Sequence, residues 1–291
     1  MTEIMDESPD LQTVFALNIT LLSGIADKRM FQAFAKVKRE DFLGPPPWYR
    51  PASLDGEAET SSSDLAFIYE DSVIALDRTQ GVNNGAPGLH AHCLAALGIK
   101  PGQDILHIGA GTGYYSAILA ELTGDGGRVF AVEIDPGRAA SAKENLALWP
   151  QVEVQAGSGT SGTLPEADII YVNAGAASPC QPWLDALRPG GKLLFPLQFG
   201  SGFSALLLVK KPADEPGWKT RLFRKAEAWE ARFLLQANFI HCEDLPATKD
   251  RSLELRAGFE DDSWTKVRHL YFNTEPDKKC WFNGDGWWLG K

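Results

Sequence analysis

Glycine occupies every second position of residues 109–113, between an apolar segment and a segment with helical periodicity. The apolar segment, residues 104–108, is typical of a buried strand, and residues 114–122 repeat apolar side chains at helical spacing. A strand, a glycine-rich turn and a helix together form a nucleotide-type cofactor site, because glycine lets a ligand approach the backbone closely. The dinucleotide fingerprint requires glycine at position 114, where this chain has Tyr114. The pattern therefore favours S-adenosyl-L-methionine over NAD or FAD.

An acidic residue lies near the end of the next apolar segment, residues 128–134, where a nucleotide cofactor needs one. Glu133 follows Gly113 by 20 residues, about the separation at which a carboxylate binds the ribose hydroxyls. The alternative is a strand that ends by chance in two carboxylates, Glu133 and Asp135. The order and spacing of the loop and the acid favour the cofactor interpretation, since a lone glycine turn is much weaker evidence.

Strands and helices alternate from residue 104 onward, which predicts an α/β fold with a parallel sheet. The predicted strands cover 104–108, 128–134, 152–155, 168–172, 192–196 and 204–209, and the predicted helices cover 89–97, 114–122, 136–147 and 181–187. Ahead of them, residues 11–34 predict two helices, with a break at Gly24 and with Asp27 as the N-cap of the second. Beyond residue 210 the pattern weakens to a helix at 253–259 and a strand at 264–272.

Three parts are expected along the chain. Residues 1–80 form a helical and irregular N-terminal cap, residues 81–210 form the cofactor-binding core, and residues 211–291 form a C-terminal extension packed on that core. The aromatic tail, residues 280–289, is expected to dock on the protein's own surface, because tryptophans near a chain end usually do so. The alternative is a contact with a substrate or a partner.

Composition narrows the class of protein. The 291 residues carry a net charge of −10, which argues against the phosphate backbone of nucleic acid as the main partner. We find no apolar stretch of the roughly 20 residues that a membrane span needs and no signal-peptide pattern. The four cysteines are scattered without a C-x-x-C pair. These features predict a cytoplasmic protein with reduced thiols and no membrane partner. They assign no oligomeric state.

With these segments in view, the chain resembles the protein L-isoaspartyl (D-aspartyl) O-methyltransferase family over residues 30–210. The resemblance is carried by several segments besides the glycine loop with its Tyr114. They are the V-x-R-E-x-F-like pattern within Phe34–Phe42, Tyr69–Asp71 with the following segment 79–91, Val129–Asp135, Ala167–Ala177, and the L-x-P-G-G turn within Leu187–Leu193. The resemblance implies a Rossmann-like class I methyltransferase, with a doubly wound, mostly parallel sheet of seven strands. It also implies S-adenosyl-L-methionine as cofactor and isoaspartyl residues of damaged proteins or peptides as substrate.

The resemblance also implies roles for individual residues. Gly109, Gly111 and Gly113 lie beneath the methionine part of the cofactor, Glu133 binds the ribose, and Ile134 packs on the adenine. The remaining cofactor-binding residues implied are Ala110, Tyr114, Gly157, Ser158, Asn173 and His107. No metal site is expected, because His90 and His92 point about 200° apart on a helix.

Three departures from the family pattern bear on function. His107 stands where an acid often lies, either as a packed or hydrogen-bonded supporting group or as a base. Ser158 stands in place of the acid of a Gly-Asp pair near the adenine amine, so the hydrogen bond there loses its charge assistance. In the acceptor-binding segment T-I-S-x-P, Gly85 replaces the serine, which leaves Asn83 or Asn84 as amide donors.

Asn84 and Gly85 are therefore the candidate catalytic positions, and Asn83, Ala86 and Pro87 are the candidate substrate-binding positions. Two alternatives stay open: transfer to a different peptide or small molecule, and a cofactor-binding protein without catalysis that binds a partner. If the missing hydroxyl is decisive, Gly85→Ser raises isoaspartyl methylation. Gly111→Val abolishes cofactor binding if the loop assignment is correct.

Overall fold

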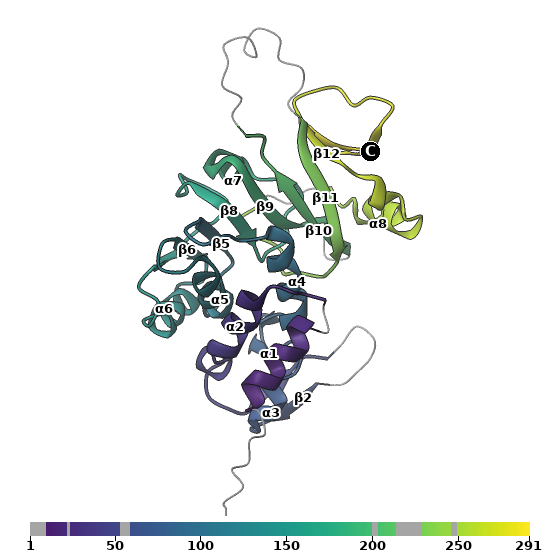
Figure 1. Cartoon of the computed structure of the whole chain (residues 1–291). Coiled ribbons are helices and arrows are strands. Elements are labelled where there is room, and N and C mark those ends of the chain that lie inside the picture. The colour runs from purple at the N-terminus through teal and green to yellow at the C-terminus, as the bar shows by residue number, and fades with distance from the viewer. Residues whose placement is uncertain (1–9, 22–23, 53–58, 200–202, 214–227, 246–248) are drawn as a thin grey trace, which may run out of the picture.

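The computed structural model describes residues 10–21, 24–52, 59–199, 203–213, 228–245 and 249–291. It has the predicted α/β architecture, built on one large sheet with helices against it (Figure 1). Within these ranges no helix has both the length and the apolar character needed to span a bilayer. Parts of the predicted N-terminal cap and C-terminal extension lie outside the described residues, and the boundaries of the three parts stay a prediction.

Five strands of the sheet are mutually parallel, in the order β9-β8-β5-β6-β7. They are β5 (Asp104–Ile108), β6 (Arg128–Glu133), β7 (Val152–Ala156), β8 (Ala167–Val172) and β9 (Leu187–Phe199), joined in part by α5 (Tyr114–Thr123), α6 (Pro136–Asn145) and α7 (Gln181–Ala186). The chain runs outward from β5 to β7, then returns to place β8 on the other side of β5. A crevice forms at such a reversal, at the carboxyl ends of the strands.

The other half of the sheet is antiparallel and makes the strand count ten instead of the predicted seven. It is formed by β10 (Phe203–Lys210), β11 (Ala228–Gln236), β12 (His269–Phe272), β14 (Trp287–Gly290) and β13 (Cys280–Asn283), in that spatial order from β9. The first half of the predicted strand 264–272 is instead a 3₁₀ helix, η2 (Ser263–Lys266), and a helix, α8 (Ser252–Glu260), precedes it. The C-terminal strands thus continue the core sheet.

The aromatic tail docks on the protein itself, as predicted. Trp287 and Trp288 are about 5% exposed or less, and the Trp288 ring stacks on Tyr271 of the neighbouring strand with 4.0 Å between centroids. Trp281 packs edge-on against Phe233 at 5.3 Å. These rings cover the antiparallel half of the sheet with apolar surface from the end of the chain.

The N-terminal residues fold into short helices and two small antiparallel strand pairs, which lie together on one side of α4 (Figure 1). The elements are α1 (Leu11–Leu21), α2 (Lys28–Lys36), η1 (Glu40–Phe42), β1 (Trp48–Arg50), β2 (Thr60–Ser62), α3 (Leu65–Ile68), β3 (Ala75–Asp77), β4 (Val82–Asn83) and α4 (Pro87–Leu97). The Asp27 side chain accepts from Arg29 N at 2.9 Å, which confirms the predicted N-cap of α2. Pro87 starts α4 earlier than predicted, since its fixed φ suits the first helical position.

Both faces of the central parallel strands β5 and β8 are buried, whereas β7 at the edge of the sheet is largely exposed. Ile105 belongs to the cluster formed with α1, α2, α4 and α5, whereas the next residue, Leu106, belongs to the cluster formed with α7 and α8. Consecutive strand residues point to opposite faces, so a continuous apolar run is what a strand covered on both sides requires. The sheet is therefore held rigidly, and the loops at its edge are placed by it.

Candidate functional site

A pocket lies at the carboxyl ends of β5, β6 and β8, at the point where the strand order reverses. Its cofactor side is formed by the residues after these strands, its second wall by residues 82–86 ahead of α4, and its third wall by residues 238–244 after β11. The predicted site residues that line it are Asn83, Asn84, Gly85, Ala86, Gly109, Ala110, Gly111, Tyr114, Glu133, Ile134, Gly157 and Asn173. His107, Gly113, Ser158 and Pro87 do not line it.

The glycine loop leaves open space for a ligand. Gly111 has φ +58°, and a Cβ added there would contact only Leu76 Cδ1, at 3.7 Å. The space beside this backbone therefore belongs to the pocket. Gly113 has a different role, because a Cβ at this position would lie 2.8 Å from Leu146 Cδ1. Gly113 lets α5 start close to the end of α6.

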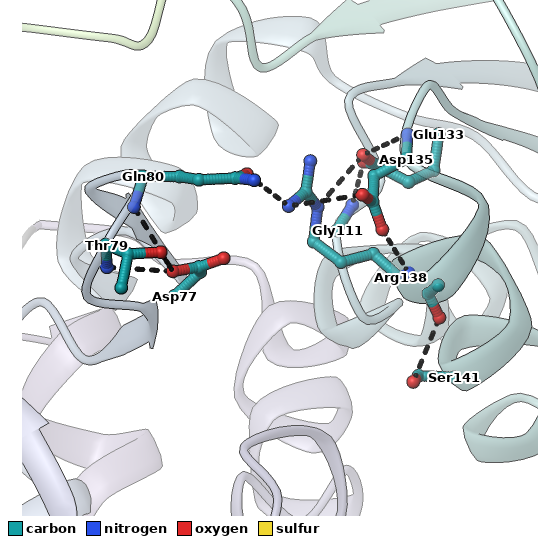
Figure 2. Close-up of polar contacts among 9 residues, drawn as sticks. Asp77, Thr79, Gln80, Gly111, Glu133, Asp135, Arg138 and Ser141 are labelled. Atoms are coloured by element: carbon teal, nitrogen blue, oxygen red, sulfur yellow. Dashed lines mark hydrogen bonds and ion pairs between the residues drawn. The ribbon is translucent and has the colours of Figure 1, made fainter.

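Glu133 accepts three hydrogen bonds, one of them from the glycine loop (Figure 2). Its Oε2 accepts from Gly111 N at 2.8 Å, and its Oε1 accepts from Arg138 Nε at 3.1 Å and from Asp135 N at 3.2 Å. Arg138 Nη1 also donates to Gln80 Oε1 at 3.3 Å, which joins the acidic residue to the N-terminal part. Because Oε1 already accepts twice, Oε2 is the oxygen with capacity left for a ligand hydroxyl.

Arg138 lines the pocket and was missed in the sequence analysis. A signal existed, since Asp135 and Pro136 mark a helix start and place Arg138 in the first turn. Asp135 Oδ1 accepts from Arg138 N at 2.7 Å, so the same helix start positions the arginine against Glu133.

His107 lies behind the pocket wall and not in it, which corrects its assignment as a cofactor-binding residue. It is fully buried, with Nδ1 2.8 Å from Ser116 Oγ and Nε2 2.8 Å from Asn173 Nδ2. Burial lowers the pKa of His107 to about 3, so the ring is neutral. It accepts from the Asn173 amide, and the buried Asn173 Oδ1 has no hydrogen-bond partner among the described residues.

Ser158 is tied to the C-terminal segment instead of facing the pocket. Its hydroxyl donates to the side chain of Asp244, a residue that lines the pocket, and accepts from Ser161 Oγ at 2.8 Å. Residues 238–244 are fixed by two backbone bonds, Gly175 N to Ile240 O at 2.8 Å and Cys242 N to Gly175 O at 2.9 Å. The sequence did not predict this third wall, because residues 238–244 have no periodic pattern and their position depends on contacts with distant loops.

The second wall is shaped around a buried arginine. Arg39 is completely buried and donates to the carbonyls of Ile68, Glu70, Ser72 and Gly85 and to Asn84 Oδ1 (3.2 Å). Gly85 has φ +70°, and its N donates to Asn83 Oδ1 at 2.9 Å. The wall therefore depends on an arginine supplied from more than forty positions earlier in the chain.

His90 of α4 stands immediately behind Gly85. A Cβ added to Gly85 would lie 2.2 Å from His90 Nε2, so the imidazole edge fills the space that a side chain would need. The ring stacks on Tyr115 with 3.6 Å between centroids, and its Nδ1 is 2.7 Å from the Tyr171 hydroxyl. Burial, followed by the charges of His107 and Arg39, lowers the pKa of His90 to about 3.

Comparison with known proteins connects this geometry to a family. The model of the family "Protein-L-isoaspartate(D-aspartate) O-methyltransferase (PCMT)" matches residues 18–222. The chain is 36% identical over 195 residues to the protein-L-isoaspartate O-methyltransferase of Aeropyrum pernix, covering 65% of this chain and 67% of that protein. It is 35% identical over 198 residues to the enzyme of that name from Methanopyrus kandleri, covering 66% and 79%.

Solved structures agree on the fold. A protein-L-isoaspartate O-methyltransferase superposes with a TM-score of 0.63 at 24% identity, covering 85% of this chain and 69% of that one. A Plasmodium falciparum structure described as a protein of the same kind, in complex with S-adenosyl-L-homocysteine, gives a TM-score of 0.61 at 16% identity, covering 81% and 100%. On the family match and the sequence relatives, the chain belongs to the protein-L-isoaspartate(D-aspartate) O-methyltransferase family.

Proposed function

We propose that this protein transfers a methyl group from S-adenosyl-L-methionine to the carboxylate of isoaspartyl residues in damaged proteins or peptides. Membership in the family supports this activity. The observation that carries the proposal is a single pocket that brings together the glycine loop with Glu133 and the acceptor wall at Asn84 and Gly85. A donor and an acceptor of a group transfer need to lie side by side in this way.

The residues present fit the cofactor. The space beside Gly111 and the remaining acceptor capacity of Glu133 Oε2 suit a ligand with hydroxyl donors. Ile134 is 37% exposed and lines the pocket, so an apolar surface is available for a flat ring. When bound, S-adenosyl-L-methionine supplies an electrophilic methyl group on a positively charged sulfur.

The acceptor needs no general base. A carboxylic acid has an ordinary pKa near 4, so the substrate is already an anion at neutral pH. His90 lines the pocket and His107 lies behind its wall, and burial lowers the pKa of each to about 3, so neither ring is charged at neutral pH. The residues of the chain therefore act by holding the carboxylate in line with the methyl group and by excluding water.

The charge behind the acceptor wall favours an anionic acceptor. Arg39 is buried with carbonyl and amide oxygens as partners, and the ion pairs found among the described residues do not include it. A buried guanidinium stays charged, and its field is weakly screened in a low dielectric. Because it lies next to Asn84 and Gly85, it stabilises a negative group on the pocket side of this wall.

The test is transfer of a radiolabelled methyl group to an isoaspartyl peptide, with the normal aspartyl peptide as the matched control. Binding of S-adenosyl-L-homocysteine, measured by calorimetry in the same preparation, reports whether the cofactor site is intact. Selective labelling of the isoaspartyl peptide supports the proposal. Cofactor binding without labelling rejects this acceptor and favours another one, or a protein that binds without catalysis.

We also propose a cytoplasmic location and a protein or peptide partner. The four cysteines are free thiols in the structure, and three of them are buried. The net charge of −10 opposes binding along a nucleic-acid backbone.

A further inference from the structure

We propose that the carboxylate of Asp244 binds the adenine amine of S-adenosyl-L-methionine, and that Ser158 positions this carboxylate. The inference rests on the cofactor part of the proposed function and is independent of the identity of the methyl acceptor. Asp244 lies in the third wall of the pocket, beyond residues 18–222 that the family model matches. The cofactor site of this chain therefore includes a residue from outside the region that it shares with the family model.

The base of the cofactor has a defined place in the pocket. Glu133 Oε2 has capacity for a ribose hydroxyl, and the next residue, Ile134, is 37% exposed and lines the pocket. Gly157 N donates to Glu133 O at 2.9 Å, which holds the residues after β7 beside the end of β6. Nothing lies within 4 Å of a Cβ added to Gly157, so the space beside it is open. A base joined to a ribose at Glu133 therefore reaches the space between Ile134 and residues 157–160.

Ser158 holds Asp244 at the edge of this space. The Ser158 hydroxyl donates to Asp244 Oδ2, because an ionised carboxylate has no proton to give. Ser158 Oγ in turn accepts from Thr160 N at 3.1 Å and from Ser161 Oγ at 2.8 Å. Gly157 and Thr160 line the pocket on either side of Ser158, and Asp244 lines it as well. The carboxylate therefore borders the place proposed for the base.

The second oxygen of Asp244 has capacity for a ligand. Among the described residues, Asp244 forms no ion pair and no hydrogen bond besides the one from Ser158. A carboxylate oxygen accepts and cannot donate, so the partner that it selects is an N–H or O–H group. The exocyclic amine of adenine supplies N–H donors, whereas an oxygen at the same position of the ring supplies none. The wall therefore favours an amino purine over an oxo purine.

Two other assignments are less consistent with this geometry. Glu243 also lines the pocket, but no described residue holds its side chain, so binding through it would cost more conformational entropy than binding through Asp244. The cofactor has a second donor that suits a carboxylate, the ammonium of its methionine part, at the end opposite to the base. The position of Ser158 just after β7, on the Glu133 side of the pocket, favours the base.

The test is calorimetry with S-adenosyl-L-homocysteine, with S-inosyl-L-homocysteine, in which an oxygen replaces the amine, and with methylthioadenosine, which lacks the ammonium. Asp244→Asn keeps the size of the side chain and an oxygen for Ser158, and removes the charge. We expect it to raise the Kd of S-adenosyl-L-homocysteine and of methylthioadenosine by about tenfold, the value of a hydrogen bond to a charged group. The Kd of S-inosyl-L-homocysteine should not rise, since the new amide can donate to the ring oxygen.

Exchange of the two side chains tests Ser158 as a positioning residue. Ser158→Ala should weaken S-adenosyl-L-homocysteine less than Asp244→Asn does, and it should reduce the preference for the amine over the oxygen. The double variant Ser158→Asp/Asp244→Ser moves the carboxylate to the segment after β7 and should recover most of the affinity. The matched control is Asp285→Asn, in the exposed turn between β13 and β14, which makes the same chemical change outside the pocket and should bind all the ligands as the wild type does.

The outcomes separate this inference from the proposed function. A wild type that prefers S-adenosyl-L-homocysteine over S-inosyl-L-homocysteine, and an Asp244→Asn variant that loses this preference, support the inference whether or not an isoaspartyl peptide is methylated. An unchanged preference in Asp244→Asn overturns it. A loss for S-adenosyl-L-homocysteine without a loss for methylthioadenosine also overturns it and assigns Asp244 to the ammonium. A wild type that binds none of the ligands rejects both the inference and the cofactor part of the proposed function.

Discussion

Gly85 occupies a backbone conformation that other residues adopt at a cost, and it does so against the edge of His90. Its φ is +70°, and an added Cβ would stand 2.2 Å from His90 Nε2. The hypothesis that Gly85→Ser raises isoaspartyl methylation fits the family pattern but not this wall. We expect Gly85→Ser to lower kcat/KM by about tenfold or more, because the serine displaces the imidazole and strains the loop. Initial rates with an isoaspartyl peptide check this.

The control for backbone strain is Gly24→Ser. Gly24 has φ +71° and nothing within 4 Å of an added Cβ, so the substitution brings the same strain without a collision. Gly24→Ser should lose stability and keep kcat/KM. A Gly85→Ser variant more active than the wild type would show that His90 moves away from the added hydroxyl. It would support the hypothesis that the missing serine hydroxyl limits isoaspartyl methylation.

Gly111 offers a second test at this scale. The space beside it is open except for Leu76 Cδ1 at 3.7 Å, so the side chain in Gly111→Val enters the pocket where the cofactor is proposed to lie. We expect calorimetry to show loss of S-adenosyl-L-homocysteine binding, while thermal unfolding shows only the modest cost of a branched residue at positive φ. Unchanged affinity would reject the assignment of this loop.

At the scale of elements, Gly113 and Gly111 of the same loop have different functions. A Cβ there would lie 2.8 Å from Leu146 Cδ1, at φ +99°. We expect Gly113→Ala to lower the free energy of unfolding by about 2–4 kcal/mol through strain and overpacking between α5 and α6. Cofactor affinity of the folded fraction should stay near the wild-type value. Urea unfolding and calorimetry measure the two quantities.

A double-mutant cycle identifies the cause. In a Leu146→Ala background, the cost of Gly113→Ala should shrink, because the opposing methyl groups are gone. Strictly additive effects would assign the whole cost to the backbone and none to the contact between the helices.

The elements that sequence predicts well are those whose signals are local. The strand before the glycine loop, the helix after it and the N-cap at Asp27 follow from residues within one or two turns of each other. The contacts that decide the acceptor wall are not local. Arg39 meets Asn84 across 45 positions, and Ser158 meets Asp244 across 86. A loop without periodicity carries no signal for such contacts, so residues 238–244 and the role of His90 emerge only in the folded molecule.

At the scale of the whole molecule, two buried neutral histidines make stability depend on pH. The pKa values of His90 and His107 fall to about 3, from about 6.5 in an unfolded chain, because burial disfavours the charged ring. Between these values the unfolded chain binds more protons, so the free energy of unfolding falls as the pH falls. The expected slope is up to about 1.4 kcal/mol per pH unit for each ring.

Chemical unfolding at pH 6.0, 5.5 and 5.0 measures this slope. His107→Gln removes one of the two titrating groups and should reduce the slope by up to about 1.4 kcal/mol per unit, whatever its effect on stability at pH 7. An identical slope in the variant would mean that His107 does not stay neutral in the folded protein.

We propose that residues after β10 belong to the same folding unit as the core. Strand β12 pairs with β11, and Leu255, Phe259 and Leu270 are buried in the cluster beneath the sheet. Removing residues 249–291 would expose the edge of β11 and this apolar surface. We expect the truncated chain to aggregate or to melt far below the full chain in calorimetry. A truncated chain that unfolds at the same temperature would define the extension as a separate unit.

The third wall of the pocket determines when, during synthesis, the binding pocket is complete. Residues 238–244 form one wall of the cavity and pair with Gly175, which lies 65 positions before Ile240 and 67 before Cys242. A ribosome that has already made the glycine loop, Glu133 and the acceptor wall still holds a chain with an open-sided cavity. During synthesis, the third wall of the binding site is therefore completed only after residue 244 has emerged.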